Sequence, residues 1–145
     1  MTEAPAPVFD PKLFMDRVRT YGHGGALGIS YVDHGPDWCM LSLPYDDRLV
    51  AGRDGVLASG PIVSLMDMAT SLSLWVKLGR FRPQATLDLR IDYLRPARPG
   101  AAIVGRGECY GITRSVGFTR GIAHDGDPGD PVAHVSATFM FTDAG

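Results

Sequence analysis

Cysteine is scarce in this sequence of 145 residues, which contains only Cys39 and Cys109. The two thiols lie far apart, and no histidine stands at metal-ligand spacing from a cysteine or a carboxylate, so neither a disulfide framework nor a metal site is predicted. An excess of charge is also lacking, since the net charge is −2 and the pI is about 6.0. The overall charge therefore gives no indication of a nucleic acid or a membrane surface as a partner.

A long apolar run is missing too. The most apolar stretch, 62–78, is interrupted by a carboxylate and several hydroxyls, which makes it too polar for a lipid-facing span. The first twenty residues hold three acidic side chains and no basic start followed by an apolar run, so no signal peptide is predicted. We therefore expect reduced thiols and a cytoplasmic location. Sequence signatures of a phosphate loop, a serine-hydrolase elbow and a cysteine nucleophile are also absent.

A buried central helix is predicted between Gly55 and Gly79. Ser59 or Gly60 can cap its start, and Pro61 suits the first turn because its missing N–H had no intrahelical partner. Gly79 is a natural C-terminal stop. Apolar residues occupy nearly every side of the segment, which is the pattern of a helix enclosed by other structure.

One face of this helix is polar. At 100° per residue, Gly60, Ser64, Asp67 and Ser71 fall on a single narrow face, which we call the polar seam. A mid-helix carboxylate is most often simply solvated. Among apolar neighbours, however, an ionisable group is costly unless it is used, so Asp67 is the leading candidate functional residue. The hydroxyls of Ser64 and Ser71 are candidate substrate contacts beside it.

The rest of the chain predicts one α+β domain with six antiparallel strands. A short helix is expected over 10–20, with Leu13, Phe14 and Val18 facing inward and a glycine cluster ending it. Residues 1–8 are expected to be flexible. The strands are predicted at 27–32, 38–43, 84–94, 101–110, 114–124 and 131–142.

The strand at 84–94 alternates most clearly. Leu87, Leu89, Ile91 and Tyr93 share one face, which is predicted to be buried, and Thr86 falls on the other. Six strands that must bury one face and one apolar helix that must be covered satisfy each other if the sheet curls around the helix.

With these elements the chain resembles the hotdog fold and, within it, the PaaI-like acyl-CoA thioesterases. The resemblance rests on 55–60 leading into 65–69, on 86–97, and on 131–134 opening the last strand. It covers about 27–141. It implies a curved six-stranded antiparallel sheet around a long central helix, and hydrolysis of an acyl-CoA thioester with no cofactor besides the coenzyme A of the substrate.

The resemblance also implies roles for individual positions. Asp67 matches a helix carboxylate that acts as general base or nucleophile, and Ser59 with Gly60 matches a turn whose backbone N–H polarises the thioester carbonyl. Thr86 matches a hydroxyl that assists the attacking water, and Arg114 a basic position near the nucleotide phosphates. The sequence departs from the family where its turn histidine is replaced by Ala58 and where an asparagine would hold the water, because the chain has no asparagine.

Two further expectations follow from spacing and charge. Asp67 lies eight residues after Ser59, or about 12 Å along a helix, so one carbonyl cannot contact both within one chain. A composite site in a homodimer or a dimer of dimers is predicted. Residues 80–120 hold eight arginines against three acidic side chains, and Arg95 and Arg98 at strand ends are candidate partners for coenzyme A phosphates.

Two alternative functions remain open from the sequence. The first is a non-catalytic protein that binds acyl-CoA or another small ligand on the same scaffold. The second is a hotdog dehydratase or hydratase, which would need a histidine beside the helix carboxylate where this chain has Ala58. The acyl group, and the choice between base and nucleophile for Asp67, also stay open.

Overall fold

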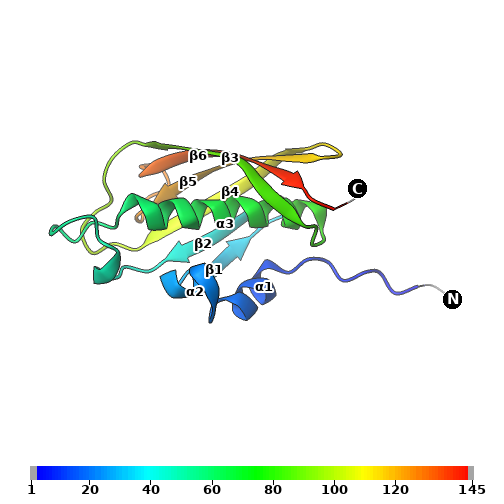
Figure 1. The fold of residues 1–145 in the computed structure, drawn as a ribbon, viewed down its shortest axis with the longest axis horizontal. Helices are drawn as coiled ribbons and strands as arrows, with labels where there is room; N and C mark the ends of the chain where they lie inside the picture. The colour runs from blue at the N-terminus through cyan, green and yellow to red at the C-terminus, as the bar shows by residue number, and fades with distance from the viewer. Residues whose placement is uncertain (1–2, 144–145) are drawn as a thin grey trace.

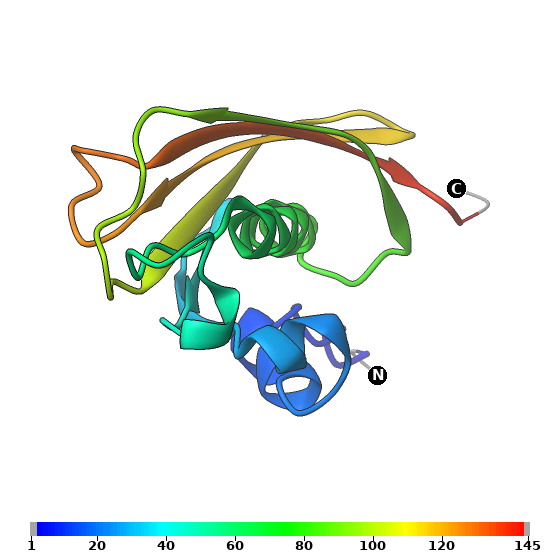
Figure 2. The ribbon, with the colours of Figure 1, turned by 60° about the vertical axis from the view of Figure 1, so that its left-hand side comes forward.

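A six-stranded antiparallel sheet curves around one long helix in the computed structural model, which describes residues 3–143 (Figure 1). The strands are β1 Ser30–His34, β2 Trp38–Leu43, β3 Gln84–Tyr93, β4 Ile103–Ile112, β5 Val116–His124 and β6 Ala133–Phe141. Their order across the sheet is β1-β2-β4-β5-β6-β3, so β1 and β3 form the edges. Figure 2 shows the sheet arching over the central helix. The predicted hotdog architecture is confirmed.

The central helix, α3, spans Ser59–Leu78 and ends at Gly79, whose φ of 69° is left-handed as a C-terminal glycine stop requires. Its N-cap is Ala58, one residue before the predicted caps Ser59 and Gly60, and no side chain in the described part of the protein caps the helix. Ser59, Gly60 and Pro61 instead form the first turn. Proline fits there because the N–H groups of a first turn have no intrahelical acceptor.

The sheet packs unusually close to α3 where its strands carry glycine. A Cβ built on Gly107 of β4 would lie 2.5 Å from the carbonyl oxygen of Ala69, and one on Gly117 of β5 would overlap the Leu74 side chain. The core therefore forms directly between helix and sheet, around buried side chains such as Leu65 and Met66.

Two short helices precede the sheet and cover α3 from the opposite side (Figure 2). The first, α1, spans Pro11–Val18, and the Asp10 carboxylate caps it by accepting from two backbone N–H groups. The prediction that Leu13 faces inward is wrong, since its side chain is 48% exposed, and Met15 is buried instead. Of the segment predicted to be flexible, residues 1–2 lie outside the described residues, and residues 3–8 are exposed and without helix or strand.

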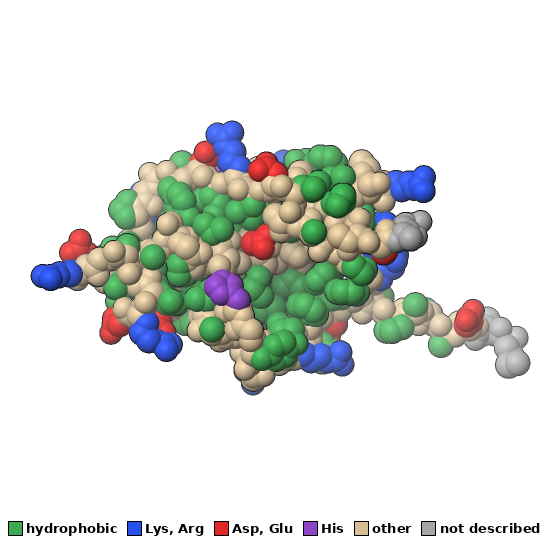
Figure 3. All heavy atoms as spheres, viewed as in Figure 1, with side chains coloured by type: hydrophobic (Ala, Val, Ile, Leu, Met, Phe, Trp, Pro, Cys, Tyr) green, Lys and Arg blue, Asp and Glu red, His purple; other side chains and the backbone are tan. Residues whose placement is uncertain are grey.

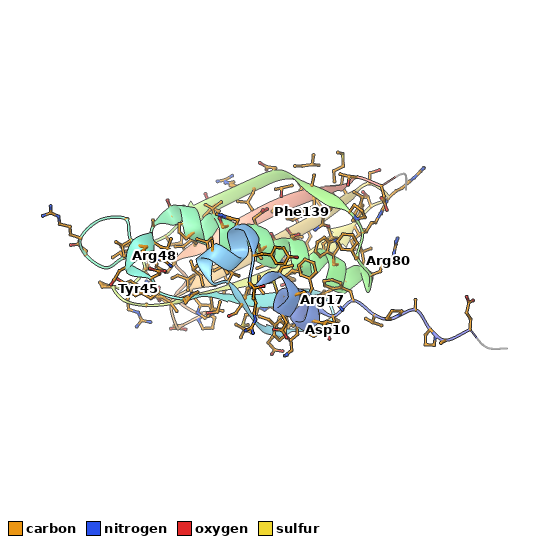
Figure 4. The ribbon with its side chains drawn as sticks, turned by 60° about the horizontal axis from the view of Figure 1, so that its bottom comes forward. Asp10, Arg17, Tyr45, Arg48, Arg80 and Phe139 are labelled. Carbon is orange, nitrogen blue, oxygen red and sulfur yellow. The ribbon has the colours of Figure 1, made fainter. Side chains whose placement is uncertain are left out.

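The glycine cluster does more than end α1, because it forms a second helix, α2, over Gly22–Leu27. Its C-terminal Gly28 has a φ of 74°, the left-handed cap that only glycine adopts cheaply. A 3₁₀ turn, η1, follows at Asp47–Leu49 in the loop before α3. Figure 4 shows Tyr45 and Arg48 of this loop at the opposite end of the molecule from Arg80, which follows α3. None of the described helices is long and apolar enough to span a bilayer.

The edge strand β3 contains a bulge at Leu87. Its neighbours Thr86 and Asp88 pair with the consecutive residues Phe139 and Thr138 of β6, so Leu87 is one residue in excess. The extra residue exchanges the two faces of the strand, and Thr86 thereby faces α3 together with Leu89. The predicted alternation is therefore wrong at two positions: Leu87 is 54% exposed, and Thr86 does not point away from the helix. The predicted burial also fails for Tyr93, whose side chain is 45% exposed.

Candidate functional site

The half-buried carboxylate of Asp67 lies midway along α3, and Thr86 of β3 reaches it across the gap between helix and strand. The Thr86 hydroxyl Oγ1 donates a hydrogen bond of 2.8 Å to Asp67 Oδ1. Among residues 3–143 no second side chain donates to this carboxylate and no cation pairs with it. One oxygen is thus held by a neutral hydroxyl, while the other can take a proton.

A second contact ties β3 to the polar seam one turn further along. Gln84 Nε2 donates to Ser71 Oγ at 2.6 Å and to the Ser71 carbonyl at 3.2 Å. Its other amide atom, Oε1, is buried without a hydrogen-bond partner. The hydroxyl and carbonyl oxygens of Ser71 therefore already accept hydrogen bonds from Gln84, and β3 lies close to α3 along this end of the seam.

The opposite side of the seam is bordered by α2, which places His23 beside it. His23 Nε2 lies 2.7 Å from Ser64 Oγ, and the Ser64 hydroxyl also donates to the Gly60 carbonyl at 3.3 Å. The sequence reasoning missed His23, because 41 residues separate it from Ser64 and the glycine-rich stretch around it gave no sign of a helix.

The first turn of α3 borders an apolar cavity of about 440 Å³. Ser59, Ile62 and Tyr93 line it together with residues of the loops before α3 and after β3. The Tyr93 hydroxyl donates to the Ser59 carbonyl at 3.2 Å. Asp67 does not line this cavity, in agreement with its position about 12 Å further along the helix axis.

The structure corrects the role expected for Arg95. All five of its N–H donors are used within the chain, on the Asp125 carboxylate, the Asp130 carboxylate and carbonyl, and the Pro96 carbonyl. No donor is left for a phosphate. The hydrogen bonds from Arg95, with the backbone N–H of Arg98, hold the pKa of the buried Asp125 carboxyl well below its usual range.

The other two candidate arginines, Arg98 and Arg114, differ in whether their guanidinium groups already have a hydrogen-bond partner. Arg98 also contacts Asp125, through Nη2 at 3.4 Å, but its side chain is 64% exposed. Arg114 is exposed in the turn between β4 and β5, and among residues 3–143 only its backbone carbonyl is engaged, accepting a hydrogen bond of 3.3 Å from Arg82. A guanidinium with free donors is therefore available at Arg114.

Neither thiol chemistry nor a metal centre is suggested by the side chains of residues 3–143. Burial raises the pKa of the Cys39 thiol to about 12 and also raises that of Cys109, which keeps both protonated. No cluster of three or more histidine, cysteine or acidic side chains in this part of the chain could hold a metal ion.

Comparisons with known proteins agree with this geometry. A sequence model of the thioesterase superfamily matches residues 54–132, more than half of the chain. A crystal structure of a Pseudomonas aeruginosa protein is 39% identical, with a TM-score of 0.78 over 89% of this chain and 94% of that one. A mutant of the phenylacetic acid degradation protein PaaI from Thermus thermophilus is 22% identical, with a TM-score of 0.68 over 81% and 96% of the two chains. A Halobacterium salinarum protein that carries an esterase name is 28% identical over 124 residues, 80% of this chain and 82% of its own length.

Proposed function

This chain belongs to the thioesterase superfamily and has the PaaI-like hotdog fold, and we propose that it hydrolyses an acyl-CoA thioester to a free acid and coenzyme A. The hydrogen bond from Thr86 to Asp67 carries the proposal, because it orients a carboxylate that would otherwise be a costly residue in mid-helix. Coenzyme A enters only as part of the substrate.

In the proposed reaction Asp67 is the general base. Thr86 occupies one carboxylate oxygen, and the other takes a proton from a water molecule whose oxygen attacks the thioester carbonyl carbon. The new C–O bond converts the carbonyl oxygen to an oxyanion. When the carbonyl re-forms, the C–S bond breaks, its electron pair leaves on sulfur, and the proton on Asp67 is released to solvent or to the thiolate.

The first turn of α3 supplies the proposed oxyanion site. The N–H groups of Ser59 and Gly60 have no acceptor within the helix, no side chain caps them, and the positive end of the helix dipole lies there. Since this turn is about 12 Å from Asp67 along the same helix, it must come from a second copy of the chain.

We therefore place each active site between two protomers, with Asp67 of one facing the α3 first turn of the other. The edge strand β3 supports this arrangement, because one side of its backbone is unpaired and the side chains of Leu87 in β3 and Leu94 directly after it are exposed. The assembly is a homodimer or a dimer of such dimers. Arg114, whose guanidinium has no partner within the described residues 3–143, is the proposed contact for the nucleotide phosphates.

Release of free thiol from a panel of aromatic, short-chain and long-chain acyl-CoAs tests the function. We expect turnover of at least one class, and a loss of about 100-fold or more in kcat for Asp67→Asn, which keeps the size of the side chain but not its basicity. Asp16→Asn is the matched control, because Asp16 is an exposed carboxylate of α1 paired only with Lys12. Thr86→Ser should retain most of the activity that Thr86→Val loses.

Three outcomes would contradict the proposal in different ways. Acyl-CoA binding without thiol release would identify a binding protein, and loss of water from a 3-hydroxyacyl-CoA would identify a dehydratase. Full activity in Asp67→Asn would show that Asp67 is not the general base. A single turnover in ¹⁸O-labelled water tests for a nucleophile, since label in the Asp67 carboxylate would show a mixed anhydride hydrolysed at the Asp67 carbonyl, whereas general-base attack puts the label only in the released acid.

A further inference from the structure

The polar seam lies between α2, whose His23 contacts Ser64, and β3, whose Thr86 contacts Asp67. Figure 1 shows α3 running between these two elements. The α2 backbone is close to α3 here, because a Cβ built on Gly24 would lie 3.0 Å from the Met68 thioether. Figure 3 shows histidine and carboxylate side chains set among hydrophobic ones on this face. Asp67 is thus bordered by two elements: β3, which supplies the Thr86 hydroxyl, and α2 on the other side.

The α2 side carries a short chain of hydrogen bonds. The Ser64 hydroxyl donates to the Gly60 carbonyl at 3.3 Å, so its oxygen is free to accept, and His23 Nε2 lies 2.7 Å from it. With its proton on Nε2, His23 donates to Ser64 and fixes the orientation of a hydroxyl that would otherwise rotate. A hydroxyl oxygen has two lone pairs, so Ser64 Oγ keeps one for a further donor.

Asp67 lies three residues after Ser64 on the same helix. Side chains at this spacing have Cβ atoms about 5–6 Å apart, and one water molecule with two hydrogen bonds of about 2.8 Å spans such a separation. A water between them would give one hydrogen to the Asp67 oxygen that Thr86 leaves free and the other to Ser64 Oγ. Both of its hydrogens would then be directed, and a lone pair would point away from the helix.

We propose that His23 is a positioning residue for hydrolysis, acting through Ser64 to hold the attacking water against Asp67. This inference rests on the proposed function. The bonds made and broken are those of the general-base step: the water proton directed at Asp67 is transferred, the water oxygen bonds to the carbonyl carbon, and the C–S bond breaks with its electron pair on sulfur. His23 loses no proton and touches no reacting atom.

Steady-state kinetics of His23→Ala, His23→Gln, Ser64→Ala and the double variant His23→Ala/Ser64→Ala test this role. We expect His23→Ala to lower kcat about tenfold with KM within a factor of two, the loss of one productive hydrogen bond. His23→Gln should recover most of kcat, because its amide N–H can replace Nε2–H. The double variant should be no slower than Ser64→Ala alone, since residues that act as one unit are not additive.

His134→Ala is the matched control, because His134 is an exposed histidine of β6 outside the polar seam, and it should retain wild-type kcat. The inference is overturned if His23→Ala keeps full kcat, if only KM changes, if His23→Gln is as slow as His23→Ala, or if the two single losses multiply in the double variant. His23 is exposed, and thermal unfolding measurements check that its variants fold. Should His23→Ala fail to fold, the kcat values of His23→Gln and Ser64→Ala still test the inference.

The failure of this inference can be told apart from failure of the proposed function. If Asp67→Asn abolishes thiol release while His23→Ala does not reduce it, the thioesterase proposal stands and His23 is only a surface residue. If the wild-type protein releases no thiol from any acyl-CoA, both are wrong.

Discussion

Tyr93, the last residue of β3, donates a hydrogen bond of 3.2 Å to the carbonyl oxygen of Ser59, the first residue of α3. The peptide unit that contains this carbonyl also contains the N–H of Gly60, a proposed oxyanion donor. A hydrogen bond to one end of a peptide polarises the other end, so Tyr93 strengthens the donor without touching the substrate oxygen.

Tyr93→Phe is therefore expected to lower kcat by about two- to fivefold and to leave the cavity it lines nearly unchanged in shape. The measurement is thiol release under saturating acyl-CoA. Tyr110→Phe is a suitable control, since Tyr110 is an exposed tyrosine of β4. An unchanged kcat in Tyr93→Phe would show that the hydrogen bond has no part in catalysis.

The proposed active site between two protomers predicts complementation between two inactive chains. In a heterodimer of Asp67→Asn with Gly60→Pro, which removes the Gly60 N–H, one of the two sites combines an intact base with an intact first turn. We expect purified heterodimers to show about half of the wild-type activity per dimer, while each parental homodimer is nearly inactive. Verified heterodimers without recovered activity would exclude the composite site.

Arg114→Ala should weaken the binding only of substrates that carry the nucleotide. The expected result is a rise in KM of about three- to tenfold for an acyl-CoA and no change for the same acyl group on N-acetylcysteamine, because one exposed charge-assisted contact is lost. Arg17→Ala in α1 is the control. An equal rise in KM for both substrates would show that Arg114 does not contact the nucleotide phosphates.

The Arg95–Asp125 pair predicts how stability depends on pH. The folded-state pKa of Asp125 is depressed, chiefly by hydrogen bonds from Arg95, so the pair's contribution is fully present above the unfolded pKa of about 3.9. It decreases as pH falls below that value toward the folded pKa. Chemical unfolding of wild type and Asp125→Asn at pH 7 and pH 3 should give a smaller stability difference at pH 3; an equal difference would contradict the assignment.

Local patterns in the sequence were enough to predict the main elements. The apolar stretch from Ile62 to Leu78, the proline in its first turn and Gly79 at its end all act within a few residues, and so do the turns that separate the strands. The same locality explains why Asp67 could be identified as exceptional, since its neighbours on the helix are mostly apolar.

The parts that could not be predicted depend on contacts between distant residues. Glycine is a poor helix former, so nothing in 22–27 indicated the helix that brings His23 to Ser64. The sequence predicts Arg95 as a phosphate contact because its partner Asp125 follows 30 residues later, beyond the reach of local patterns. The order of the strands across the sheet was also beyond the sequence, because turns constrain only adjacent pairs.

The bulge at Leu87 divides β3 into two halves that differ in which residues face α3, the even-numbered or the odd-numbered ones. Before it, even-numbered residues such as Thr86 face the helix; after it, odd-numbered residues such as Leu89 do. Regular pairing through Leu87 would place Thr86 and Leu89, which are three residues apart, on opposite faces of the strand, so either the hydroxyl or the apolar half would turn outward. By leaving Leu87 out of the alternation, the bulge lets one edge strand present the proposed catalytic hydroxyl and a packing surface on the same side.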